Sequence, residues 1–162
     1  MNRNLVSPEA LAKWAGILLN HSLGGIKPGE RVMLKGEAVC WPMINELQKQ
    51  IIQAGGIPDV YLVGPDNERG RVWGAAMGEF GTDEQLAAIP AWHLARYESM
   101  NKYIEVLGIE DPSQFNTLIA ERAAKLAKAD MPFRKIRCDK PWVLTLFPTA
   151  HAVDLQTQQR IF

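Results

Sequence analysis

Helical and strand-like patterns of apolar residues alternate along the chain. Ser7 can cap a first helix in which Leu11, Trp14 and Leu18 repeat at helical spacing. Four short apolar runs predict strands, at residues 32–34, 60–63, 103–107 and 142–147. Because helical patterns separate these runs, we expect an α/β fold in three layers, with a mostly parallel sheet of about four or five strands and helices on both faces.

Two of the later helical patterns carry their own start signals. Thr82 and Gln85 have the spacing of a capping box, and a stripe of apolar residues continues from it to Met100, with a kink expected at Pro90. Asp111 precedes Pro112 as a second N-cap, leading into a helix with apolar residues that include Leu126 on its inner side.

The segment 64–81 is rich in glycine, and it can be a helix or a loop. Gly70, Gly74 and Gly78 recur every fourth residue, so they would share one helical face, and a helix is the favoured prediction. Together with apolar neighbours such as Trp73 and Phe80, this face is a candidate dimer surface. The alternative is that these apolar side chains complete the domain's own core.

The length of the chain fits one domain. Residues 1–150 are predicted to form a single α/β domain, and 151–162 to begin a linking helix after Asp154. The helical pattern is still running at Phe162, which favours the N-terminal domain of a longer enzyme.

The composition indicates which partners and which cellular compartment to expect. The 18 basic and 18 acidic residues balance, so no nucleic acid partner is expected. No apolar run of membrane-spanning length and no signal peptide are present, so we expect no membrane partner and a cytoplasmic location. Cys40 and Cys138 fit separate thiols in a reducing compartment, although a bridge between them stays open.

Recognisable catalytic and cofactor motifs are absent from the sequence. It contains no glycine-rich phosphate loop and no H-E-x-x-H, and its three histidines have no partner at a familiar metal-ligand spacing. His93 is interpreted as a hydrogen-bonded core or interface histidine, and His21 as a partner of a helix C-terminus. The basic run from Arg134 to Lys140 is interpreted as a solvated face. We therefore predict no catalytic residue and no metal ligand in this chain.

The carboxyl ends of the predicted strands are where a ligand would bind in such a sheet. Candidate cleft residues there are Glu37, Asp66, Pro148, Thr149 and, just beyond the last strand, His151. Glu110 and Asp111 follow the third strand and could join Glu37 and Asp66 as paired carboxylates. The alternative is that these are ordinary solvated loop residues.

Three stretches together resemble the amino-terminal domain of the thermophilic metallopeptidase family typified by aminopeptidase T, which also includes leucyl aminopeptidases. They are Ile26-Lys27-Pro28-Gly29-Glu30-Arg31-Val32-Met33-Leu34, the helix end Ala54-Gly55-Gly56, and Trp142-Val143-Leu144-Thr145-Leu146-Phe147-Pro148-Thr149. Pro90-Ala91-Trp92 and Glu110-Asp111-Pro112 fit the same pattern between them.

This resemblance implies a two-domain exopeptidase that removes N-terminal residues from peptides with two divalent metal ions, such as zinc or cobalt. The metal ligands would belong to a following C-terminal catalytic domain, so this chain alone is expected to be inactive, to shape the substrate cleft and to take part in a homodimer. Two alternatives remain: a free-standing α/β module that binds a small ligand, or a metal enzyme of the same scaffold with different chemistry, such as a ring-cleaving dioxygenase.

Overall fold

The four predicted strands form one parallel sheet. In the computed structural model, which describes residues 6–63, 74–108 and 120–149, they are β1 (Arg31–Glu37), β2 (Ile57–Val63), β3 (Lys102–Leu107) and β4 (Trp142–Leu146). Their order in space is β2-β1-β3-β4, and every neighbouring pair is parallel. The predicted α/β class is therefore confirmed, with four strands in the described residues.

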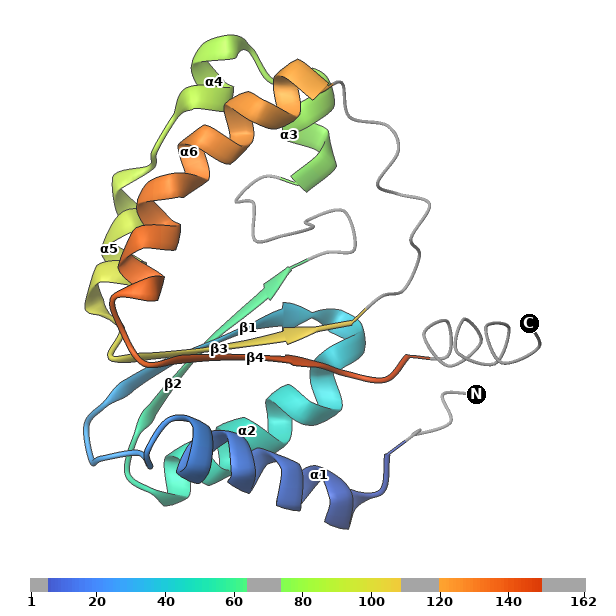
Figure 1. Ribbon diagram of the computed structural model, residues 1–162, viewed down its shortest axis with the longest axis vertical. Helices are drawn as coiled ribbons and strands as arrows, with labels where there is room; N and C mark the ends of the chain where they lie inside the picture. Colours follow the sequence, from blue (N-terminus) through green and yellow to red (C-terminus); the bar gives the residue numbers. More distant parts are fainter. Residues whose placement is uncertain (1–5, 64–73, 109–119, 150–162) are drawn as a thin grey trace, which may run out of the picture.

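Helices cover both faces of this sheet (Figure 1). On one face lie α1 (Pro8–Gly16), which continues into the π-helical turn η1 (Ile17–Ser22), and α2 (Trp41–Gln53), which follows the short 3₁₀ turn η2 (Ala38–Cys40). On the other side lie α3 (Gly74–Phe80), α4 (Asp83–Ala87), α5 (Ala91–Ser99) and α6 (Ala120–Cys138).

The helix caps predicted at Ser7 and Thr82 are present. The Ser7 hydroxyl accepts a hydrogen bond from the Ala10 amide at 3.2 Å, at the start of α1. In the capping box of α4, the Gln85 amide donates to Thr82 Oγ1 and the Thr82 amide donates to Gln85 Oε1. Each contact satisfies a backbone donor that the first helical turn leaves without a partner.

The single kinked helix expected around Pro90 is wrong, because the structure has two separate helices there. α4 ends at Ala87, and the backbone is extended at Ala88 and Pro90 before α5 begins at Ala91. A proline disfavours helical geometry in the residue before it, so the chain turns instead of bending. The stripe survives on either side of the break: Leu86, His93, Tyr97 and Met100 are all buried, whereas Ile89 is exposed.

Several predictions fall outside the described residues. The start of the helix expected at Asp111 and the linking helix of 151–162 lie there, as do Gly70 and Trp73 of the glycine face. The C-terminal part of that face is helical, in α3. Gly78 is buried, and its carbonyl oxygen accepts a hydrogen bond from Arg122 of α6, so at this position the helix packs within the domain.

Two hydrophobic cores flank the sheet. The larger core packs α1 and α2 against residues of the central strands, including Val32, Leu34 and Ile104. The smaller core lies under α5 and α6 and contains Met33, Tyr97, Met100, Tyr103 and Phe133. Among the described helices, none is long and apolar enough to cross a membrane.

Candidate functional site

The carboxyl edge of the sheet contains a topological switch between β1 and β3. The chain passes from β1 to β2 on one side and then crosses to β3 on the other side of β1. Ligands of open α/β sheets bind outside the strand ends at such a point. Glu37, the last residue of β1, and Gly108, directly after β3, flank this switch, and Glu37 is half-buried.

The described part of this edge is tightly packed. A Cβ placed on Gly108 would lie 2.6 Å from Val39 Cγ1, 2.7 Å from Cys40 Sγ and 3.5 Å from Thr149 Cγ2. The segment after β4 therefore reaches the start of α2, and Thr149 is buried there while Pro148 is half-buried. Glycine at position 108 is what allows this close approach.

The structure thus brings some of the candidate cleft residues to the same edge. Glu37 ends β1 at the switch point, whereas Pro148 and Thr149 follow the edge strand β4. Asp66 and His151 lie outside the described residues, as do the carboxylates Glu110 and Asp111. Cys40 and Cys138 are not joined by a disulfide bond; Cys40 is buried and Cys138 is exposed.

The metal ions implied by the family resemblance find no set of ligands in the described residues. Residues 6–63, 74–108 and 120–149 contain no group of three or more His, Cys, Asp or Glu side chains placed to hold an ion. Such a centre needs several converging ligands.

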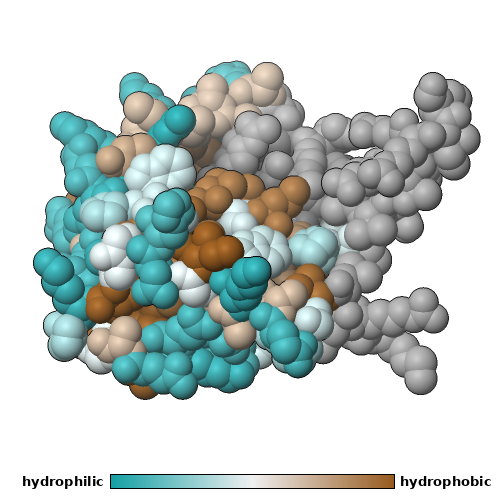
Figure 2. Space-filling view, turned by 60° about the horizontal axis from the view of Figure 1, so that its bottom comes forward, coloured by the Kyte–Doolittle hydropathy of each residue, from teal (hydrophilic) through white to brown (hydrophobic). Residues whose placement is uncertain are grey.

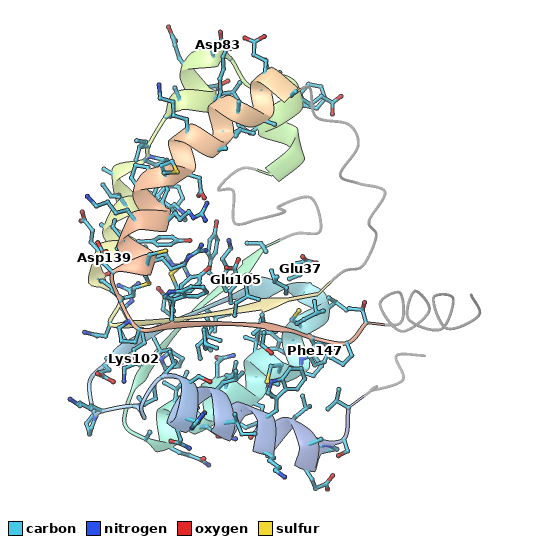
Figure 3. All side chains as sticks on the ribbon, in the orientation of Figure 1. Glu37, Asp83, Lys102, Glu105, Asp139 and Phe147 are labelled. Atoms are coloured by element: carbon cyan, nitrogen blue, oxygen red, sulfur yellow. The ribbon has the colours of Figure 1, made fainter. Side chains whose placement is uncertain are left out.

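A second polar group, which the sequence analysis missed, lies on the sheet face beneath α5 and α6. Lys35 in β1 and Glu105 in β3 are register partners, and Lys35 Nζ lies 3.4 Å from Glu105 Oε1. Arg137 of α6 donates to Glu105 Oε2 at 3.1 Å. Figure 3 shows Glu105 on this face of the sheet and Phe147 on the opposite one. The carboxylate therefore joins the two central strands to α6.

Burial dominates the electrostatics of this ion-pair cluster, formed by Lys35, Glu105 and Arg137. Lys35 is 1% exposed, and its desolvation lowers the pKa of the ammonium group even though Glu105 opposes that change. Removing a charge from water costs several kcal/mol unless a counter-charge compensates. Glu105 supplies this counter-charge for Lys35. Lys35 and Glu105 are buried, and the cluster links β1, β3 and α6.

Beside this cluster, His93 occupies an aromatic environment. Its ring lies 4.8 Å from that of Phe133, 5.2 Å from that of Tyr97 and 5.5 Å from that of Tyr61. The expected burial of His93 is confirmed, but neither ring nitrogen has a hydrogen-bond partner among the described residues. Burial, aided by the positive charges of Arg96 and Lys35, lowers the pKa of His93 from 6.5 to about 4.

The interpretation of residues 134–140 as a solvated basic face is wrong for two of its members. Arg134 and Lys135 are exposed, but Arg137 pairs with Glu105, and Lys140 Nζ donates to the carbonyl oxygens of Tyr97, Glu98 and Met100. These two cations turn inward because α6 ends above the sheet, next to the Glu105 carboxylate and the carbonyl groups at the end of α5. One sequence signal could have predicted the buried ion pairs: Lys35 and Glu105 are charged residues in the middle of otherwise apolar strands.

The fold and its site geometry define an α/β domain with a parallel sheet and a switch point between β1 and β3. No protein-family model matches the sequence, and no curated protein matches it either. Among solved structures, the wild-type AmpT from Thermus thermophilus, an aminopeptidase T, is similar, with a TM-score of 0.63 and 19% sequence identity. The match covers 86% of this chain and 36% of that chain. At this identity the likeness establishes the fold.

Replacement of Glu105 should destabilise the domain strongly. Glu105→Gln leaves Lys35 and Arg137 without their buried counter-charge, and we expect a loss of about 3 kcal/mol in the free energy of unfolding. Glu121→Gln is the matched control, because Glu121 pairs with Lys125 on the surface, and exposed pairs contribute less than about 1 kcal/mol. Urea unfolding measures both variants; equal losses would contradict the role of the ion-pair cluster.

Stability should also fall as the pH is lowered from about 6.5 to about 4. Unfolded His93 binds a proton near its ordinary pKa of 6.5, whereas in the folded state it stays neutral down to a pKa of about 4. The unfolded state therefore gains protons first, which lowers the free energy of unfolding by roughly 2–3 kcal/mol across this window.

The variant His93→Phe isolates this contribution. It should flatten the pH dependence of unfolding between pH 6.5 and pH 4 relative to the unsubstituted protein. Ile52→Phe, at an exposed position without a titratable group, provides a control and should leave the profile unchanged. If the His93→Phe profile is as steep as that of the unsubstituted chain, the account of His93 is wrong.

Proposed function

We propose that this chain is the non-catalytic N-terminal domain of a metal-dependent aminopeptidase, a hydrolase that removes N-terminal residues from peptides. The observation that carries the proposal is the likeness to AmpT, which covers most of this chain but about a third of the other. On this proposal a C-terminal catalytic domain of the same polypeptide holds the two divalent metal ions, and the expected compartment is the cytoplasm.

The carboxyl edge of the sheet supports a role in shaping the substrate cleft. Glu37 ends β1 at the switch point, and Thr149 lies close to Gly108, next to Cys40 at the start of α2. Pro148 precedes Thr149 and is half-buried. On this proposal the edge forms one wall of a cleft, with the catalytic domain as the other wall. Asp66 and His151 stay candidates for the same wall, and a homodimer stays the expected assembly.

The proposal predicts that activity needs more polypeptide than these 162 residues. The reading frame beyond the codon for Phe162 should encode a domain rich in clustered Glu, His and Asp, and the longer product should hydrolyse aminoacyl anilides in the presence of zinc or cobalt. A chelator should abolish this activity, and added metal should restore it.

The 162-residue chain is the matched control and should not hydrolyse the same anilides. A stop codon directly after Phe162 would contradict the proposal and favour a free-standing ligand-binding module. A longer product that cleaves aromatic rings with oxygen but leaves the anilides intact would contradict it as well.

A further inference from the structure

The two edge strands of the sheet, β2 and β4, differ in how their outer backbone groups are treated. In a parallel ladder, alternate residues direct both their N–H and their C=O to one side of the strand. In an edge strand, every second residue therefore directs its N–H and C=O away from the sheet, where these groups have no partner strand. Such a row of groups is a template for another strand unless it is blocked.

The edge at β2 is blocked. The Ile57 amide donates to the Glu30 carbonyl, so Pro58, Val60 and Leu62 are the residues that face outward. Pro58 has no N–H, and the Val60 carbonyl accepts a hydrogen bond from Arg96 Nη2 at 2.8 Å. A charge also stands at this edge, because the Asp59 carboxylate is held by Arg31 at 2.6 Å and by Arg96 at 2.7 Å.

The edge at β4 carries none of these blocks among the described residues. The Tyr103 amide donates to the Pro141 carbonyl and the Phe147 amide donates to the Leu107 carbonyl, so residues 142, 144 and 146 face outward. No proline or charged residue interrupts β4. The side chains of Trp142, Leu144 and Leu146 also share one face of the strand and are 45%, 46% and 51% exposed.

We propose that β4 pairs with β4 of a second copy of this chain, in antiparallel orientation about Leu144, to form one continuous eight-stranded sheet. In this register Leu144 lies opposite its symmetry mate, and Trp142 lies opposite Leu146 of the other copy. Every outward N–H and C=O from Trp142 to Leu146 then gains a partner, because residues two apart form hydrogen-bonded pairs in an antiparallel ladder.

The pattern of β4 points to a second copy because it complements itself. All three cross-strand pairs on the exposed face join large apolar side chains, and such pairs stabilise an antiparallel ladder. No like charges meet, since the sequence from Pro141 to Thr149 contains no charged residue. An isologous contact of this kind closes after two copies, so it produces a dimer.

Apolar residues are visible on the surface of the domain (Figure 2). Apolar residues gather at the centre of the face shown in Figure 2, with polar residues around them. Pro141 and Pro148 bound the strand, which limits the pairing to its five residues. The inference supplies a surface for the dimer proposed above, but it does not depend on the peptidase proposal.

Sedimentation velocity of the 162-residue chain over a range of concentrations tests this pairing directly. The unsubstituted chain should sediment as a monomer–dimer equilibrium. Leu144→Lys should weaken association roughly 10-fold or more, because it places two ammonium groups at the symmetry axis. Leu62→Lys on β2 is the matched control, as Leu62 is 45% exposed on the blocked edge, and it should associate like the unsubstituted chain.

Disulfide trapping tests the register independently of the lysine variants. In a Cys138→Ser background, Leu144→Cys should form a covalent dimer under mild oxidation, because directly opposed residues lie at disulfide distance. Leu62→Cys should not. A monomeric unsubstituted chain, a dimer that Leu144→Lys leaves intact while circular dichroism shows it folded, or equal trapping at both positions would overturn the proposal. None of these outcomes bears on peptide hydrolysis, which the longer product tests.

Discussion

Burial of the two central strands on both faces is the constraint on which the rest of the structure depends. Of the seven residues of β1, the five in the middle are buried, and β3 is buried from Lys102 to Val106. Any charge in these strands must therefore be neutralised inside the protein. Lys35 and Glu105 meet this requirement by pairing across the ladder, and Arg137 extends the pair to α6, so the helix on one face is tied to the strands at the centre of the sheet.

Because the two central strands are buried, the surfaces available for contacts are the strand ends and the two edge strands. The buried strands carry the switch point, where Glu37 and Thr149 lie at the edge that ligands use in open α/β sheets. The edge strands face outward, and only β2 is blocked within the described residues, by Pro58 and by the hydrogen bond from Arg96 to Val60. The strand ends and the open edge of β4 are therefore the two features on which the proposals above depend.

The strands and the helix caps could be predicted from the sequence because each depends on local information. The apolar runs at β1 to β4 and the Thr82–Gln85 capping box are contained within a few residues. The Lys35–Glu105 pair joins residues 70 positions apart, and it brings together charges that a local pattern treats as exposed. The inward orientation of Arg137 and Lys140 was not predicted either, because it depends on where α6 ends above the sheet. In the candidate site, Thr149 lies near the start of α2 because of the order of the strands in the sheet. The sequence pattern predicted the strands but not their order.

Amide hydrogen exchange along β4, measured by NMR at several protein concentrations, tests the central claim most directly. The amides of Val143 and Thr145 point toward β3, so they should be protected at every concentration. The amides of Leu144 and Leu146 point outward, and their protection should rise with concentration as the second copy pairs with them. Unprotected exchange at Leu144 and Leu146 at every concentration, beside protected neighbours, would contradict the account.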